Sequence, residues 1–227
     1  MKLSLLEAVR GLLERTYRIR TPVADLGSFV IGDLGYRELY ESERAALGIG
    51  SAPAAARSAM TLVRETDGGT AVCVYFPDSL IRCLEDFPPQ HGIGAENLDA
   101  FATFVEEIDH LLVIAERTRQ GRPVTQFELE LHANVSKYLV LARFLAGSRR
   151  SLEAAKRLWL RHRLFDGIRY CDEDTAVRDR YRDAARWAQR LLHGLSSLRR
   201  AERIDALRQF HTSSLSEQLR QISHLAA

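Results

Sequence analysis

From residue 78 to the C-terminus, apolar residues recur with the period of an α-helix, and this pattern restricts the chain to a mainly helical fold. Breaks in the pattern fall at glycine and proline, as at Pro88-Pro89 and Gly147-Ser148. The periodicity predicts helices at 78–86, 96–119, 124–146, 151–164, 173–194 and 199–209, with a possible short helix near the end.

The N-terminal part adds a helix and a small sheet. Leucines and a valine spaced along one face predict a helix over 3–17, and the glycine-containing stretch 21–50 is interpreted as a helix-containing connector. Two strand-like runs, 60–65 and 70–76, flank an Asp-Gly-Gly tip that supplies the positive φ angles of a tight hairpin. The predicted fold class is α+β, predominantly helical, with a small N-terminal hairpin or sheet and a helical C-terminal extension.

Charge is distributed unevenly along the chain. Residues 1–142 hold 14 Lys and Arg against 20 Asp and Glu, whereas residues 143–227 hold 18 against 10. The contrast is typical of a basic partner surface near the C-terminus, or of docking between two oppositely charged parts. We predict an α+β domain at 1–148 and a helical extension at 149–227.

The cysteines and the first residues favour the cytoplasm. Cys73, Cys83 and Cys171 are odd in number and lack the short paired spacing of a zinc knot, as expected for reduced thiols. Cys73 and Cys83 are expected to be small core residues. Charged residues occur too early for a secretory signal, and no apolar run approaches the roughly 18 residues that span a bilayer. No membrane association is expected.

Chemistry-bearing residues concentrate on the helix predicted at 96–119. Its apolar residues form one stripe, and at 100° per residue Glu106, Glu107 and His110 fall together on the opposite side. One turn therefore presents two carboxylates and an imidazole. The same three residues also fit an ordinary solvated face with local ion pairs.

The next helix carries a polar row that is bracketed by apolar residues. Glu130, Asn134 and Lys137 form this row, and we interpret Glu128, His132 and Ser136 as the face exposed to solvent. A bracketed carboxylate must be paired, protonated or bound to a metal, because an unpaired buried charge costs several kcal/mol or more. Lys137 and a metal are both candidate partners of Glu130. Asn134 either orients Glu130 or satisfies a carbonyl in the core.

These two helices resemble those of a metallopeptidase family. The run Glu106-Glu-Ile-Asp-His110 resembles the His-Glu-x-x-His helix of zincins, and Glu130-Leu-His-Ala-Asn134 is similar to the Glu-x-x-Ala-Asn motif of the ImmA/IrrE-type members. In that family two histidines and a glutamate bind zinc, and the motif glutamate activates a water. The resemblance implies that His110 and Glu130 are metal ligands and that Glu107 is the general base.

The chain departs from the family at the first ligand, where Glu106 replaces histidine. Glu106 adds a negative charge to the ligand set and weakens the Lewis acidity of a bound metal. An oxygen-rich set of Glu106, His110 and Glu130 suits manganese or iron about as well as zinc. The leading hypothesis is a degenerate zincin-like protein that acts as a non-catalytic regulator or scaffold with a protein partner. A working metal-dependent hydrolase that uses the same three ligands is the alternative.

A third hypothesis rests on the basic C-terminal part. Arginines recur every four residues on the helix predicted at 173–194, with Tyr181 and Trp187 nearby, and such a ridge can bind nucleic-acid phosphates. Asp179 and Asp183 are spaced to neutralise part of the ridge. A helical adaptor that binds protein or nucleic acid would use these arginines, namely Arg178, Arg182, Arg186 and Arg190.

Overall fold

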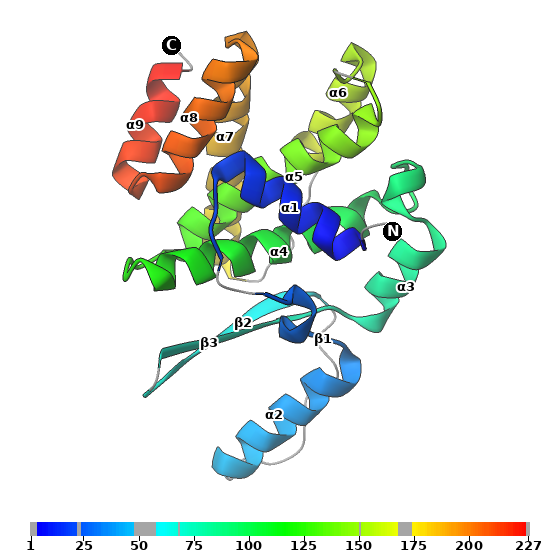
Figure 1. Ribbon diagram of the computed structural model, residues 1–227, viewed down its shortest axis with the longest axis vertical. Coiled ribbons are helices and arrows are strands. Elements are labelled where there is room, and N and C mark those ends of the chain that lie inside the picture. The colour runs from blue at the N-terminus through cyan, green and yellow to red at the C-terminus, as the bar shows by residue number, and fades with distance from the viewer. Residues whose placement is uncertain are drawn as a thin grey trace.

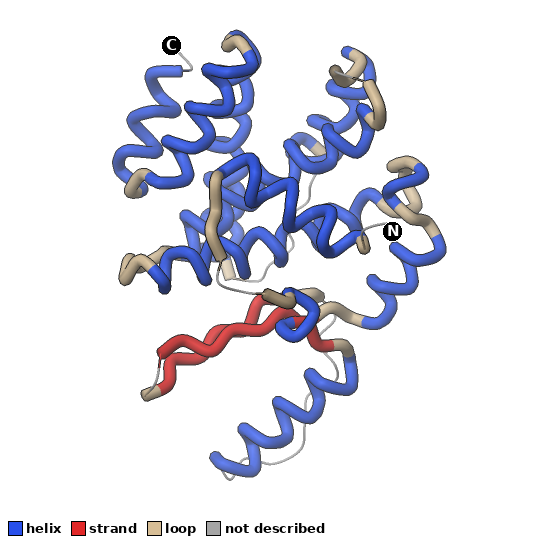
Figure 2. The backbone as a smooth tube through the Cα atoms, viewed as in Figure 1, coloured by secondary structure: helices blue, strands red, loops and turns tan. Residues whose placement is uncertain are grey.

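A computed structural model describes residues 4–21, 24–47, 58–67, 69–149, 151–167 and 174–225 (Figures 1 and 2). The helices are α1 (Leu5–Tyr17), α2 (Asp33–Leu47), α3 (Asp78–Asp86), α4 (Leu98–Arg119), α5 (Gln126–Ala146), α6 (Ala154–Arg161), α7 (Thr175–Ser197), α8 (Arg200–Thr212) and α9 (Leu215–Leu225). The strands are β1 (Val30–Ile31), β2 (Met60–Thr66) and β3 (Gly69–Tyr75). The predicted α+β fold, helical for the most part, is confirmed.

The sheet has the order β1-β3-β2. Strands β2 and β3 form the predicted antiparallel hairpin, with Thr66 opposite Gly69, whose φ of 134° lies outside the range that other residues favour. Strand β1 pairs in parallel with β3 and was not predicted. A strand of two residues inside a connector is too short to leave an alternating pattern.

Helices α4 and α5 lie at the centre of the molecule (Figure 1). The sheet packs against one side of α4, and α2 lies on the other side of the sheet (Figure 1). Helices α1, α6 and α7 all pack against α5. Because neighbours surround α5, every residue from 130 to 137 is buried, and the predicted solvent-exposed face of this helix is wrong.

A continuous apolar core joins the N-terminal and C-terminal parts, from Val9 on α1 to Ile222 on α9. It crosses the boundary predicted at residues 148 and 149, because α7 packs on α5 and α8 packs on α1. The predicted helix over 151–164 ends at Arg161 and continues as a π-helical turn over 162–166. Among the described residues, no helix is both long enough and apolar enough to cross a bilayer.

The cysteines are less buried than predicted. Cys73 on β3 and Cys83 on α3 form no disulfide and are only partly buried. The Cys83 thiol lies 3.3 Å from the carbonyl oxygen of Glu96 and donates to it. Cys171 lies outside the described residues.

Gly194 sits where α7 crosses the end of α9. A Cβ at this position would lie 2.5 Å from the carbonyl oxygen of Leu225 and 2.7 Å from its Cβ. We expect Gly194→Ala to lower the free energy of unfolding by about 1–3 kcal/mol through overpacking, measured by urea denaturation.

Gly11→Ala in α1 is the matched control. There the added Cβ would meet only the end of the Arg15 side chain, which can rotate away. We expect this variant to be neutral or slightly stabilised, since alanine favours a helix over glycine by up to about 1 kcal/mol. Equal effects at the two glycines would contradict a close contact between α7 and α9.

Candidate metal centre

The sequence of α4 determines which of its faces meets the sheet. Phe104, Val105 and Ile108 are buried, and Phe104 stacks on Phe76 next to β3 with ring centroids 4.9 Å apart. Glu106 and His110, one helical turn apart, are directed to another side of α4, toward α5. The apolar stripe thus orients both polar side chains toward the neighbouring helix.

The start of α5 is fixed by a capping box. The Thr125 hydroxyl accepts from the backbone N–H of Glu128 at 3.2 Å, and the Glu128 carboxylate accepts from the backbone N–H of Thr125 at 2.9 Å. Helix α5 then packs along α4 and brings Glu130 to the two polar residues of that helix. One possible ligand atom from each of Glu106, His110 and Glu130 lies within 4.8 Å of the other two. The three predicted ligands therefore meet.

Lys137 forms an ion pair with Glu106. Its Nζ lies 3.0 Å from Glu106 Oε2, and 11% of the Lys137 side chain and 20% of the Glu106 side chain are exposed. Burial alone would raise the pKa of Glu106, but the charges of Lys137 and His110, together with hydrogen bonds to Lys137 and Glu130, lower it. Lys137, one of the two partners predicted for Glu130, is thus paired with Glu106 instead.

Asn134 does not contact the Glu130 carboxylate through its amide nitrogen. Its Nδ2 donates to the backbone carbonyl oxygen of Glu130 at 2.8 Å. This is the second of the two roles expected for the residue, satisfaction of a carbonyl in the core.

Glu107 is held between the sheet and His110. The Thr61 hydroxyl of β2 donates to Glu107 Oε2 at 2.7 Å, and the same oxygen lies 3.6 Å from His110 Nδ1. A carboxylate beside one ring nitrogen of histidine orients the ring and directs the other nitrogen elsewhere. The geometry gives Glu107 this orienting position, and its assignment as a general base stays a prediction.

Two polar atoms of the cluster are buried without a hydrogen-bond partner. They are His110 Nε2 and Glu130 Oε2. Buried polar atoms are seldom left unsatisfied, since each costs roughly 1–3 kcal/mol. Both atoms belong to predicted ligands, and both are of the type that coordinates divalent metals.

The charges of the cluster influence one another strongly. Burial, followed by the charge of Glu106, raises the pKa of Glu130 to about 7. Burial would lower the pKa of His110, but the hydrogen bond and charge of Glu107, with the charges of Glu106 and Glu130, raise it to about 9. The metal-free cluster thus retains protons near neutral pH, and a divalent ion bound there would displace them.

Helix α7, which belongs to the C-terminal part of the chain, covers the cluster. It packs along α5, and the hydroxyl of Tyr181 hydrogen-bonds to Glu130. Burial, followed by the charge of Glu130, raises the pKa of Tyr181, so the phenol stays protonated and donates. The carboxylates are therefore enclosed by a helix of the C-terminal part.

A second buried polar cluster was missed in the sequence. Asp109 accepts from His132 Nδ1 at 2.8 Å, and His132 Nε2 lies 3.0 Å from Nδ1 of His211. These residues come from α4, α5 and α8, and all three are buried. We expected Glu128 and His132 on the surface, and this prediction is also wrong. Glu128 caps α5, and His132 hydrogen-bonds to Asp109.

Ser136 and Tyr17 extend this second cluster. The Ser136 hydroxyl hydrogen-bonds to Asp109, and the Tyr17 hydroxyl lies 2.9 Å from Ser136 Oγ. Because a carboxylate only accepts, Ser136 donates to Asp109 and Tyr17 donates to Ser136. The sequence offered one sign of this cluster, a second polar row on α5, Glu128, His132 and Ser136, beside that of Glu130, Asn134 and Lys137.

The arginine ridge of α7 is partly neutralised. Arg182 pairs with Asp179 at 3.0 Å and Arg186 pairs with Asp183 at 3.3 Å, both as the sequence spacing indicated. Arg190 lies over the ring of Trp187 at 5.1 Å from its centroid. Nucleic-acid binding by Arg178, Arg182, Arg186 and Arg190 stays a prediction.

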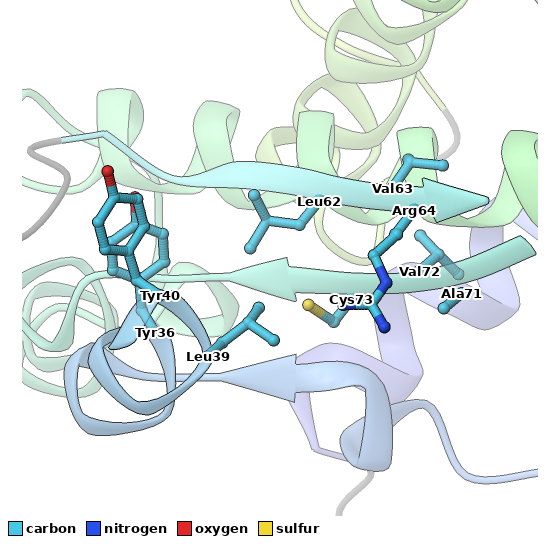
Figure 3. Close-up of a pocket in the computed structure, with 9 residues that line it drawn as sticks. All are labelled: Tyr36, Leu39, Tyr40, Leu62, Val63, Arg64, Ala71, Val72 and Cys73. Atoms are coloured by element: carbon cyan, nitrogen blue, oxygen red, sulfur yellow. The ribbon is translucent and has the colours of Figure 1, made fainter. Parts of the chain in front are cut away.

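A cavity of about 430 Å³ lies away from both polar clusters, between α2 and the β2–β3 hairpin (Figure 3). Its lining contains no carboxylate and no histidine, and its polar side chains are those of Tyr36, Tyr40, Arg64 and Cys73. The lining residues are Tyr36, Leu39, Tyr40, Leu62, Val63, Arg64, Ala71, Val72 and Cys73.

No family model, curated protein or solved structure matches this chain. The resemblance of α4 and α5 to the zincin helices therefore stays a prediction. The arguments for function rest on the geometry of the polar clusters.

Proposed function

We propose that this protein is a zincin-like metal-binding protein whose centre is structural or regulatory and not catalytic. Glu106, His110 and Glu130 hold a divalent ion in this proposal, with manganese or iron as suitable as zinc for a set of two carboxylates and one imidazole. A bound ion would supply positive charge that neutralises the carboxylates and ties α4 to α5. A protein partner would distinguish the metal-loaded protein from the metal-free protein.

The observation that carries the proposal is the pair of unsatisfied atoms. His110 Nε2 and Glu130 Oε2 are both buried without a hydrogen-bond partner, and each belongs to a residue whose candidate ligand atom lies within 4.8 Å of those of the other two. A cation among these residues would satisfy both atoms at once. Glu107 supports it by orienting the His110 ring from the opposite nitrogen.

Three features favour a non-catalytic centre over a hydrolase. Glu107 is engaged by Thr61 and His110, Tyr181 of α7 hydrogen-bonds to Glu130, and Lys137 is paired with Glu106. A peptidase must admit an extended chain to its metal, whereas here a packed helix lies over one ligand. In this proposal the protein keeps the zincin-like arrangement of ligands but not the path by which a peptide substrate would reach the metal.

The test is metal content, measured by elemental mass spectrometry on untagged protein after dialysis against zinc, manganese or iron(II). We expect about one equivalent in the natural protein and less than about a tenth of that in His110→Ala and Glu130→Ala, because a missing ligand costs a large part of the affinity. His193→Ala on the exposed side of α7 is the matched control and should keep its metal.

A protein that takes up none of the three metals, or that loses none in the ligand variants, would contradict the proposal. Hydrolysis of peptides by the loaded protein, abolished in Glu107→Gln with the metal retained, would instead establish the catalytic alternative.

A further inference from the structure

The ion pair between Glu106 and Lys137 bears directly on how such a centre would load. Lys137 is 9% exposed and its ammonium group is hydrogen-bonded to a candidate ligand. The charge of Lys137 also offsets part of the rise in the pKa of Glu130 that burial and Glu106 cause. The ammonium group thus lies close to two of the three candidate ligands.

We propose that Lys137 is an internal cation that competes with the divalent metal for Glu106, so that the strength of metal binding is set by this lysine. The inference rests on the proposed function. In the metal-free state Lys137 forms an ion pair with Glu106, whose charge His110 also stabilises among the carboxylates of Glu107 and Glu130. In the loaded state its positive charge would stay close to the cluster and oppose binding of the metal ion.

The placement of Lys137 supports this competition. Glu130 and Lys137 are two helical turns apart on α5, and the lysine side chain reaches Glu106 Oε2 on α4 at 3.0 Å. A metal held by the Glu106 carboxylate must either share that carboxylate with the ammonium group or displace it. Screening by solvent is weak because most of both side chains is buried.

The competition also links the departure from the zincin motif to Lys137. A histidine at the first ligand position would be neutral when it binds a metal, whereas Glu106 is charged and needs a counter-ion whenever the metal is absent. Lys137 supplies that counter-ion. Glu106 and Lys137 thus act as one unit in which stability without metal is gained at the expense of affinity for metal.

The experiment compares Lys137→Met with Lys156→Met, the matched control, because Lys156 is exposed on α6. Dissociation constants for Mn²⁺ and Zn²⁺ are measured by isothermal titration calorimetry, and melting temperatures are measured with and without metal. We expect Lys137→Met to bind both ions at least about tenfold more tightly, to melt lower than the natural protein without metal, and to gain more on loading. Lys156→Met should match the natural protein in each measurement.

Several outcomes would overturn the inference. If Lys137→Met binds metal as tightly as the natural protein, the lysine has no effect on binding, and if it binds more weakly, the lysine supports Glu106. Either result would overturn the competition but leave the proposed metal centre in place. Absence of binding in the natural protein, in Lys137→Met and in Glu106→Gln alike would contradict the proposed function. If Lys137→Met does not fold, Lys137→Gln and Lys137→Arg, which retain hydrogen-bond donors, are compared: tighter binding in glutamine than in arginine is expected, and equal affinities would refute competition by charge.

Discussion

Asp109→Ala is expected to lower the free energy of unfolding by about 3–5 kcal/mol, the cost of removing one partner of a buried, hydrogen-bonded pair. The Asp109 side chain is fully buried and accepts from His132 Nδ1 at 2.8 Å and from Ser136. Burial by itself would raise the pKa of Asp109, but the charge and hydrogen bond of His132 lower it. The carboxylate is thus the common acceptor of the second polar cluster.

Urea denaturation at pH 7 measures this loss, and two variants make the result specific. Asp109→Asn keeps the shape and one acceptor and should lose less than Asp109→Ala. Asp205→Ala removes an exposed carboxylate on α8, whose side chain is 78% exposed, and should change stability by less than about 0.5 kcal/mol. If Asp109→Ala were no less stable than Asp205→Ala, Asp109 would not hold α4 to α5.

His211 is expected to make the fold sensitive to acid. Burial, followed by the charge of His132, lowers the pKa of His211 from 6.5 to about 3. Asp109 acts in the opposite direction, whereas Arg117 and Arg122 add to the lowering. Between these two pKa values the unfolded chain binds a proton that the folded protein does not, so stability falls as the pH falls, by up to about 1.4 kcal/mol per pH unit.

The measurement is the free energy of unfolding of metal-free protein from pH 6.5 to pH 4.5, compared with His211→Gln. Glu130, with its raised pKa, favours folding as the pH falls in the same window, so the difference between the two proteins isolates His211. We expect the natural protein to lose more stability than His211→Gln on acidification, and His193→Gln, an exposed control on α7, to follow the natural protein. Parallel curves for the natural protein and His211→Gln would contradict a buried, neutral His211.

His211 also lies at the end of α8, where two arginines bind its carbonyl groups. Arg117 Nη2 donates to the carbonyl oxygens of His211 and Ser213 at 2.9 and 3.2 Å, and Arg122 Nη1 donates to that of Thr212 at 2.8 Å. Positive charge at the C-terminus of a helix is favourable. Protonation of His211 would add a further positive charge beside these arginines, which adds to the lowering of its pKa by burial and by the charge of His132.

Local patterns in the sequence predicted most of the fold. The apolar periodicity gave α3 its bounds and gave α4, α5 and α7 theirs to within a few residues, and the Asp-Gly-Gly tip predicted the β2–β3 hairpin. Such features depend on residues close together in the chain. Strand β1 depends instead on a distant partner, β3, and left no local pattern.

The candidate site was likewise predicted only in part from local features of the sequence. The spacing put Glu106 and His110 on one face of a helix, and the resemblance to zincins implied that they share a site with Glu130; the atoms of the three residues do meet. The sequence did not predict which group would pair with each charged residue of the site. Lys137 binds Glu106, and Thr61, 46 positions from Glu107, binds that glutamate.

The sequence by itself determined the helical segments and the hairpin, and its resemblance to zincins indicated the three residues of the candidate metal centre. Only the tertiary structure decided which polar groups are buried. Helix α5 has an apparently polar side at Glu128, His132 and Ser136, yet α1 and α8 bring Tyr17 and His211 to that side and remove it from water. The physical reason is that periodicity reports the faces of one helix, whereas burial depends on every helix that packs around it.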